Sequence, residues 1–194
     1  MALCFAHSAA GYLAYEAIRP PDAHRPRLLA AAVALANAPD LDFIPGLLIG
    51  APHAFHRGVT HTVLAAVLVG AAAVLIARRL RPASAWRIGC WAAATYGSHL
   101  LLDYLTVDVV PPAGAQFFWP FSDAYYIAPI TPIPELIVDG AGRSAFLASL
   151  HAPGTLVAWL ADLSCLLAAV AAVHVVRLLR LRQAEAQSGA ADRA

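Results

Sequence analysis

Long apolar stretches alternate with short polar segments along this 194-residue chain. The first stretch is short for a full membrane span, which needs about 20 residues. The second is interrupted by Pro39, which breaks a regular helix, and continues apolar through 43–51. This pattern predicts an all-α, polytopic membrane bundle with about four to five membrane helices. The expected helices are residues 2–18, 28–38, 59–77, 88–105 and 155–176.

Composition supports a membrane protein. The chain is 60% hydrophobic and its mean hydropathy is +0.65, which is too apolar for a soluble domain of this length. Its net charge of +1 argues against nucleic acid as a partner. Three isolated cysteines, Cys4, Cys90 and Cys165, lie in apolar stretches. We therefore expect buried small hydrophobes and no disulfide framework.

The sequence divides into one membrane-embedded domain, residues 1–182, and a tail. Residues 107–151 form the longest non-membrane stretch and are rich in proline, glycine and aromatic side chains. Aromatic residues favour the membrane–water interface, so Phe117 to Phe121 are expected there, covering the outer end of the bundle. The polar, alanine-rich residues 183–194 are predicted to be a disordered cytoplasmic tail.

The arginines set a topology, because basic residues mark the cytoplasmic side of membrane helices. One orientation leaves only Arg57 and Arg143 outside. It places the C-terminus in the cytoplasm and residues 107–151 outside. The arginines assigned to the inside are Arg19, Arg25, Arg27, Arg78, Arg79, Arg81, Arg87, Arg177, Arg180, Arg182 and Arg193.

Ionisable residues of four segments then fall at a similar depth. At about 1.5 Å per residue, His7, Asp40 and His99 lie roughly 18–20 Å from the inner boundary. Asp103 and His61 lie at roughly 24–26 Å on the same scale. Because intramembrane charges are costly and usually functional, this agreement predicts one shared polar site in the outer half of the bilayer. Asp162 lies inside the last helix without an obvious partner.

Carboxylates and imidazoles are the ligands of Zn²⁺ and similar divalent ions. His99 and Asp103 are four residues apart, so they share a helix face and can bind one ion together. We expect one or two ions, most simply zinc. Asp40 or Asp42 is a candidate general base, and Arg57 a candidate group for binding an oxyanion such as phosphate. The candidate metal ligands are His7, Asp40, Asp42, His56, His61, His99 and Asp103.

Several of these residues lie in motifs that resemble the YdjM-type family of inner-membrane proteins, described as membrane-bound metal-dependent hydrolases. The resemblance implies a multi-pass protein of the bacterial inner membrane that binds a metal and hydrolyses its substrate. His56 to His61, read H-R-G-V-T-H, is the most specific motif, and His99 to Asp103 is the least specific. The other matching pieces are His7, Ala38 to Asp42, and Trp119 to Asp123.

A more distant likeness is to the zinc-dependent phospholipase C and single-strand nuclease superfamily. That resemblance implies that His56, His99 and Asp103 hold one metal and that Asp103 and His7 share a second. It also implies a general base at Asp40 or Asp42. The chain lacks the later H-x-x-x-E pair of that superfamily, which favours one or two ions over three.

Three functions remain open at this point. The first is hydrolysis of a membrane lipid or lipid-linked phosphoester that reaches the site from the bilayer. The second is a transporter coupled to protons or metal ions, in which the same residues form a relay. The third is a non-catalytic membrane protein with a structural metal. The nearly apolar stretch 67–77 and the absence of internal repeats favour the first over the second. The sequence does not set an oligomeric state.

Overall fold

The computed structural model describes residues 4–18, 25–80, 82–108, 112–134 and 138–191. Within these ranges the ordered elements are helices, as the sequence predicts, and no strand is formed. The α-helices are α1 (Cys4–Ile18), α2 (Pro26–Asn37), α3 (Phe43–Leu48), α4 (Val63–Leu80), α5 (Ala85–Tyr104), α6 (Arg143–Ser149) and α7 (Pro153–Ala191). Short 3-10 helices span Ala38–Asp42, Val59–His61 and Pro82–Ser84.

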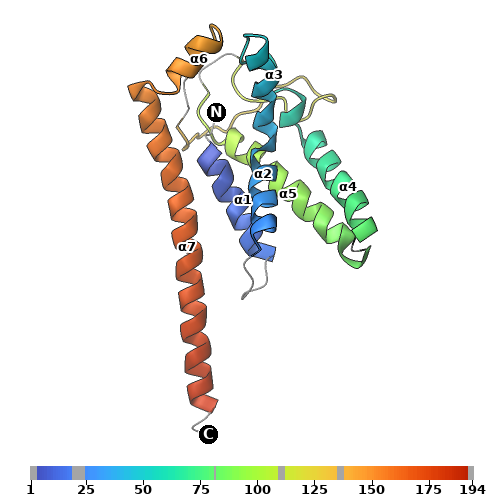
Figure 1. Cartoon of the computed structure of the whole chain (residues 1–194), viewed down its shortest axis with the longest axis vertical. Coiled ribbons are helices and arrows are strands. Elements are labelled where there is room, and N and C mark those ends of the chain that lie inside the picture. The colour runs from blue at the N-terminus through green and yellow to red at the C-terminus, as the bar shows by residue number, and fades with distance from the viewer. Residues whose placement is uncertain (1–3, 19–24, 81, 109–111, 135–137, 192–194) are drawn as a thin grey trace.

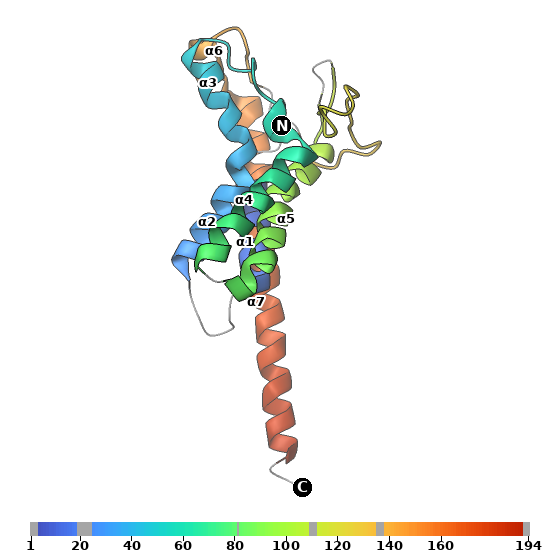
Figure 2. The same ribbon diagram turned by 90° about the vertical axis from the view of Figure 1, so that its right-hand side faces the viewer.

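Helices α1 and α2 form one antiparallel pair, and α4 and α5 form another (Figure 1). Helix α5 also packs against α1 and α2, and Trp91 Nε1 donates a hydrogen bond of 3.0 Å to the Ala14 carbonyl of α1. The long helix α7 packs along α1 and continues well past the other helices (Figure 2). Helix α5 therefore lies at the centre of the bundle and contacts both pairs.

Three segments are long and apolar enough to cross a membrane: Pro26–Leu48, Val63–Leu80 and Pro153–Gln183. The first includes α2, the 3-10 turn at Pro39 and α3, so Pro39 tightens this helix without ending it. Helix α5 has 20 residues but is less apolar, because it carries polar side chains such as His99 and Asp103. Helix α1 has 15 residues, which is short for a span.

Glycines allow the helices to approach closely. A Cβ on Gly70 of α4 would lie 2.9 Å from the Gly89 carbonyl oxygen, and a Cβ on Gly89 of α5 would lie 2.2 Å from Val74 Cγ2. At the other pair, a Cβ on Gly11 would lie 2.8 Å from the Ala32 carbonyl oxygen. Small residues at such crossings let backbones pack in van der Waals contact, which drives helix association in lipid.

Two helix boundaries differ from the sequence expectation. Helix α4 begins at Val63, because residues 59–61 form a 3-10 turn, so His61 precedes this helix. Helix α7 continues to Ala191 and includes most of the segment assigned to a disordered tail. Alanine, glutamate, glutamine and arginine in that segment are good helix formers, which explains the continuation.

The prediction that the cysteines are buried is wrong. Cys4, Cys90 and Cys165 are all exposed on the protein surface. An apolar position in a soluble protein usually faces the core, but in a membrane helix it also faces lipid. Apolar surroundings in the sequence therefore do not distinguish a core position from a lipid-facing one.

The outer loop is fixed to the upper end of α5. Val107 N donates to the Ile133 carbonyl at 2.9 Å, and Ala128 N donates to the Tyr104 carbonyl at 2.9 Å. Phe117 is buried in a cluster with Ala66, Tyr96 and Leu100, whereas Phe121 is 84% exposed. Part of the aromatic segment thus joins the protein core, and the interfacial position expected for the segment stays a prediction for its exposed members.

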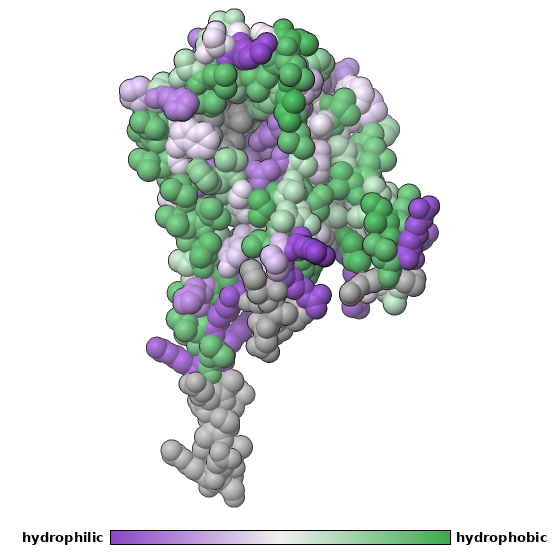
Figure 3. Space-filling view, in the orientation of Figure 1, coloured by the Kyte–Doolittle hydropathy of each residue, from purple (hydrophilic) through white to green (hydrophobic). Residues whose placement is uncertain are grey.

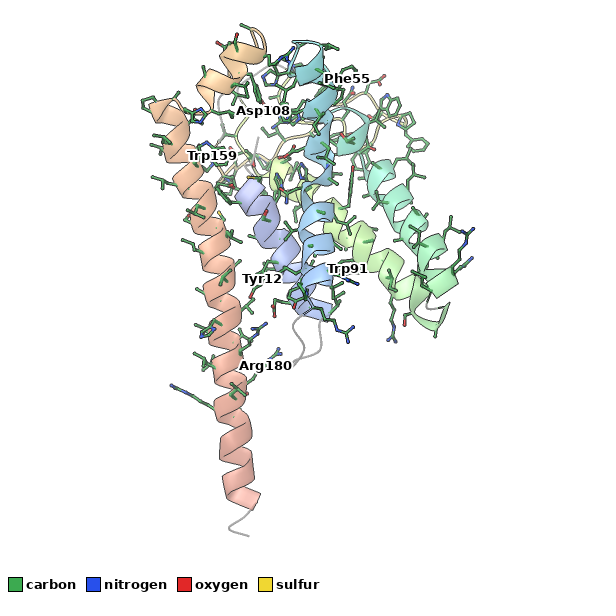
Figure 4. The ribbon with its side chains drawn as sticks, in the orientation of Figure 1. Tyr12, Phe55, Trp91, Asp108, Trp159 and Arg180 are labelled. Atoms are coloured by element: carbon green, nitrogen blue, oxygen red, sulfur yellow. The ribbon has the colours of Figure 1, made fainter. Side chains whose placement is uncertain are left out.

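The arginine-bearing ends of the helices lie toward one end of the molecule. The start of α2, the end of α4 and the start of α5 face the same way as the lower part of α7, where Arg180 is labelled (Figure 4). Arg19, Arg81 and Arg193 lie outside the described residues. The arrangement agrees with the expectation that these arginine-bearing helix ends lie on the same side of the bundle. Which side of the membrane this end faces stays a prediction.

Candidate metal centre

Four donor atoms from three segments meet in the protein interior. They are Nε2 of His61 and of His99, Oδ1 of Asp40 and Oδ2 of Asp103. The two imidazole nitrogens are 3.2 Å apart. Asp40 Oδ1 is 3.5 Å from His61 Nε2 and 3.4 Å from His99 Nε2. Asp103 Oδ2 is 3.4 Å and 3.5 Å from the same two nitrogens.

These distances fit a small divalent cation. Zinc bonds to nitrogen and oxygen of about 2.0–2.1 Å in a tetrahedron place the ligand atoms about 3.3–3.4 Å apart. Five of the six edges between the four atoms are 3.2–3.5 Å. The donor set, two imidazoles and two carboxylates, is also one that zinc accepts. The residues therefore fit a bound metal in both geometry and chemistry.

The second ring nitrogen, Nδ1, of His61 and of His99 contacts a group outside the four-donor centre. His99 Nδ1 donates to the Ala36 carbonyl at 2.9 Å. His61 Nδ1 lies 3.1 Å from Asp42 Oδ2. A proton on Nδ1 leaves the lone pair of Nε2 directed at the centre of the cluster, which is the arrangement of metal-binding histidines. Asp42 thus contacts a ligand from behind and is not itself one of the four central donors.

Asp42 also contacts a second imidazole. Its Oδ1 lies 3.1 Å from His56 Nδ1, and Thr60 Oγ1 donates to its Oδ2 at 2.8 Å. The His56 ring stacks on Phe43 with a centroid distance of 3.9 Å. His56 Nε2 is buried and makes no hydrogen bond to the described residues. Asp40, His56 and His61 offer ligand atoms that lie within 4.8 Å of one another.

His7 lies on the opposite side of the cluster. Its ring stacks on His99 with a centroid distance of 3.7 Å, and its Nε2 is 3.7 Å from Asp103 Oδ1. The side chain is fully buried, and neither ring nitrogen makes a hydrogen bond to a described residue. A buried imidazole without partners is costly, so His7 is suited to a further ligand at this position.

Comparison with known proteins agrees with the sequence motifs. The chain matches the family described as YdjM inner membrane protein over residues 1–181. The chain belongs to this YdjM inner membrane protein family. A curated relative, inner membrane protein YbcI of Escherichia coli (strain K12), is 38% identical over 109 residues. That match covers 54% of this chain and 60% of the relative. No solved structure matches.

Arg57, in the H-R-G-V-T-H motif, lies beside the cluster in sequence, but its side chain pairs with a residue outside the cluster. The Arg57 guanidinium forms an ion pair with Asp108, and Asp108 also accepts a hydrogen bond of 2.7 Å from Gly114 N. Arg57 has a positive φ of 60°, and its guanidinium also lies 3.4 Å from the Gly114 carbonyl oxygen. The arginine therefore ties the His56–His61 segment to residues 108–114, and an oxyanion-binding role stays a prediction.

The cluster is nearly sealed by protein, and its one partly open member is Asp40. The side chains of His61 and His99 have 0% exposure, that of Asp103 2% and that of Asp40 16%. Polar side chains are visible on the upper part of a face that is otherwise largely apolar (Figure 3). Of the four donors, Asp40 is the one that a substrate or water could reach most readily.

The charges around the cluster favour a cation. His56 and His61 lie in the connection between α3 and α4. Burial lowers the pKa of His56, and its hydrogen bond to Asp42 offsets part of this effect. Burial also acts to lower the pKa of His61, but hydrogen bonds to Asp103, Asp40 and Asp42 outweigh it and raise that pKa well above its ordinary value. A site that holds a proton this strongly has a negative potential.

Other residues named at the sequence level lie apart from the cluster. His53 is exposed and contacts Phe146 of α6 with a centroid distance of 6.0 Å. His151 is exposed, and its Nδ1 is 3.2 Å from the Leu147 carbonyl. Asp162, for which the sequence offers no partner, accepts hydrogen bonds from the backbone of Phe5 and Ala6.

Two supporting residues are not identified by the sequence analysis. Thr60 donates to Asp42, and Tyr96 donates to the Thr60 carbonyl at 2.7 Å. Tyr96 is three residues before His99 and so lies on the same face of α5, which is the signal that would have pointed to it. Thr60 lies inside the H-R-G-V-T-H motif, beside His61.

Proposed function

We propose that this chain is a membrane-embedded, metal-dependent hydrolase that acts on a lipid or lipid-linked phosphoester. The observation that carries the proposal is the convergence of donor atoms of His61, His99, Asp103 and Asp40, with five of the six distances between them at 3.2–3.5 Å. Zinc is the ion we propose, because its preferred ligands and bond lengths fit this arrangement. Membership of the YdjM family supports a membrane protein and is compatible with this activity.

The three most deeply buried donors, His61, His99 and Asp103, are proposed to hold the ion. Catalytic zinc sites keep three protein ligands and leave a position for water or substrate. Asp40 is the most exposed of the four donors, so we assign it to the open side of the site, as a general base toward water or substrate. When bound, the metal would lower the pKa of a coordinated water and polarise a phosphoryl oxygen.

The remaining residues are assigned by their contacts. Asp42 orients the rings of His61 and His56 through its two oxygens. The free Nε2 atoms of His56 and His7 lie on either side of the central donors and are available for substrate oxygens or for a second ion. His7 and Asp103 Oδ1, 3.7 Å apart, are the pair we assign to that second ion.

The proposed substrate class rests on where the cluster lies. Its partly exposed donor, Asp40, lies within Pro26–Leu48, a segment that is long and apolar enough to cross a membrane. A lipid could bring its headgroup to this donor while its chains stay against the apolar helix surfaces. A phosphoester is proposed because zinc with carboxylate and imidazole ligands suits the oxygen atoms of a phosphoryl group.

A transport function would need polar groups that continue toward the arginine-bearing end. In the described part of α4 and α5, that end instead encloses an apolar groove of about 270 Å³, lined by Ala73, Ile76, Ala77, Leu80 and Ile88. Among the described residues of these two helices, the buried charged side chains are His99 and Asp103, both at the other end. This distribution supports a site that opens to one side only.

The first test is elemental analysis of the detergent-purified protein after growth with zinc, iron and manganese. We expect at least one equivalent of metal in the parent and in the control His151→Ala, and loss of metal in His99→Ala. His151 is a matched control because it is an exposed histidine outside the cluster. Absence of stoichiometric metal from the parent protein would overturn the proposal.

The second test separates catalysis from a structural metal. Vesicles of phosphatidylethanolamine and phosphatidylglycerol are incubated with the metal-loaded protein, and released water-soluble phosphate compounds are measured. The parent should release them, and Asp40→Asn should keep its metal while losing turnover, because a general base is removed. A metal-loaded parent that cleaves no lipid or lipid-linked phosphoester would leave the metal structural and refute the hydrolase assignment.

A further inference from the structure

Asp162 is a buried acid in the long helix α7, with 4% of its surface exposed. Its two carboxylate oxygens accept hydrogen bonds from the first turn of α1: Oδ2 from Phe5 N at 2.8 Å and Oδ1 from Ala6 N at 2.9 Å. The first N–H groups of a helix have no partner within the helix, and a carboxylate there satisfies them and interacts well with the helix dipole. Asp162 therefore caps α1 from another helix.

The capped turn leads directly into the metal cluster. His7 follows Phe5 and Ala6 in the same turn, and its ring stacks on His99 with Nε2 3.7 Å from Asp103 Oδ1. Because the His7 ring nitrogens make no hydrogen bond to the described residues, its own polar atoms do not fix it in place. Its position depends on ring stacking and on the placement of the α1 backbone.

Helix α7 reaches the cluster through α1. It packs along α1, and no comparable contact joins it to α2, α4 or α5 in the described part of the chain. Beside Asp162, the Trp159 ring meets Phe5 edge-on with a centroid distance of 5.6 Å, and Figure 4 shows Trp159 near the start of α1. Both contacts act on the same turn of α1.

We propose that Asp162 is a positioning residue that anchors the first turn of α1 and thereby holds His7 against His99 and Asp103. The inference deepens the proposed function, because it assigns α7 a part in building the metal site. It also explains why a charged side chain is retained within a membrane helix, where an acid is costly unless it is paired or functional.

The anchor is tested in the metal-free protein, so the test does not depend on the proposed activity. Asp162→Asn keeps the shape of the side chain but replaces one acceptor oxygen with a donor, and Asp162→Ala removes both acceptors. Ser164→Ala is the matched control, since Ser164 is exposed and, among the described residues, its hydroxyl donates to the Ala161 carbonyl of its own helix. Amide exchange of Phe5 and Ala6 should accelerate at least about tenfold in the Asp162 variants, following loss of about 1.4 kcal/mol or more, and remain unchanged in the control.

The effect on the site is read from the imidazole ¹H–¹⁵N signals of His7, assigned with His7→Gln. We expect these signals to shift in Asp162→Asn, while those of the exposed His174 stay in place, and we expect no shift in Ser164→Ala. Faster exchange at Phe5 and Ala6 with unchanged His7 signals would overturn the positioning role, and unchanged exchange would overturn the anchor itself. If Asp162→Ala does not fold, Asp162→Asn decides both points. Metal content, measured separately, tests the hydrolase proposal alone.

Discussion

The two oxygens of Asp42 contact two different histidines. Oδ2 faces Nδ1 of His61, and Oδ1 faces Nδ1 of His56. Because each carboxylate oxygen accepts a hydrogen bond from an Nδ1–H group, both rings are held with Nε2 free, one toward the four-donor centre and one beside it. A single carboxylate thus decides which nitrogen of each ring can bind a ligand.

Replacing Asp42 with asparagine should weaken metal binding without abolishing it. The amide retains the shape but presents one donor in place of an acceptor, so at least one ring loses its orientation. Loss of an outer partner of a metal-binding histidine usually costs about 10–100-fold in affinity. Competition with a calibrated chelator measures the change, and the exposed Asp123→Asn should match the parent. Equal affinity in Asp42→Asn and the parent would show that Asp42 does not orient the ligands.

Replacing Asp103 with asparagine should have a larger effect. Asp103 is itself one of the central donors, and its replacement also removes one of the two carboxylates that lie close to both His61 and His99. We therefore expect an affinity loss beyond the range for outer partners, more than about 100-fold. The same chelator competition tests this, and an Asp103→Asn variant that binds metal more tightly than Asp42→Asn would reverse our assignment of the two acids.

At the scale of helices, the cluster depends on how closely α5 packs against its neighbours. Gly89 brings the lower half of α5 against α4, and the upper half of the same helix carries His99 and Asp103 into the centre. A helix that is displaced at one end also moves its other end, because helices are stiff over this length. The α4–α5 crossing therefore bears on the candidate metal site although it contains none of the proposed ligands.

Gly89→Ala should destabilise the protein, whereas Gly97→Ala on the same helix should not. A Cβ at Gly89 would lie 2.2 Å from Val74 Cγ2 and 2.8 Å from the Gly70 carbonyl oxygen, but at Gly97 the nearest atom is Ala66 Cβ at 3.9 Å. Overpacking of this kind typically costs about 1–3 kcal/mol. Unfolding in mixed detergent micelles, followed by circular dichroism, measures the difference. Similar stability of both variants would show that the helices are not in close contact at Gly89.

Sequence reasoning places the helices well because apolar run lengths and proline positions are local properties. The boundary at Val63 escapes it, since the turn at residues 59–61 is held by tertiary contacts such as the Tyr96–Thr60 hydrogen bond. Depth counting brings His7, Asp40, His61, His99 and Asp103 to one layer, and the structure brings them into contact. The position of a residue along a helix axis does not say in which direction around that axis its side chain points, however. The different positions of Asp40 and Asp42, and the partner of Asp162, follow from the packed structure alone.

At the scale of the whole molecule, polar groups are distributed unevenly along the bundle. The buried acids and histidines gather near one end, and arginine-bearing helix ends lie toward the other. Basic residues are retained on the cytoplasmic side of membrane proteins. If the arginine end faces the cytoplasm, the cluster lies in the outer half of the membrane and its substrate comes from the outer leaflet. The orientation therefore decides which pool of lipid the proposed hydrolase can reach.

Cysteine labelling in intact cells tests this orientation. Cys4, Cys90 and Cys165 are exposed and must first be replaced by alanine. Ser144→Cys on α6 and Ser84→Cys between α4 and α5 then report on opposite ends, and both positions are exposed. A membrane-impermeant maleimide should label position 144 in intact spheroplasts and position 84 only after permeabilisation, because arginine-rich ends are not translocated. Labelling of position 84 alone in intact spheroplasts would invert the topology and move the cluster, with its lipid substrate, to the inner leaflet.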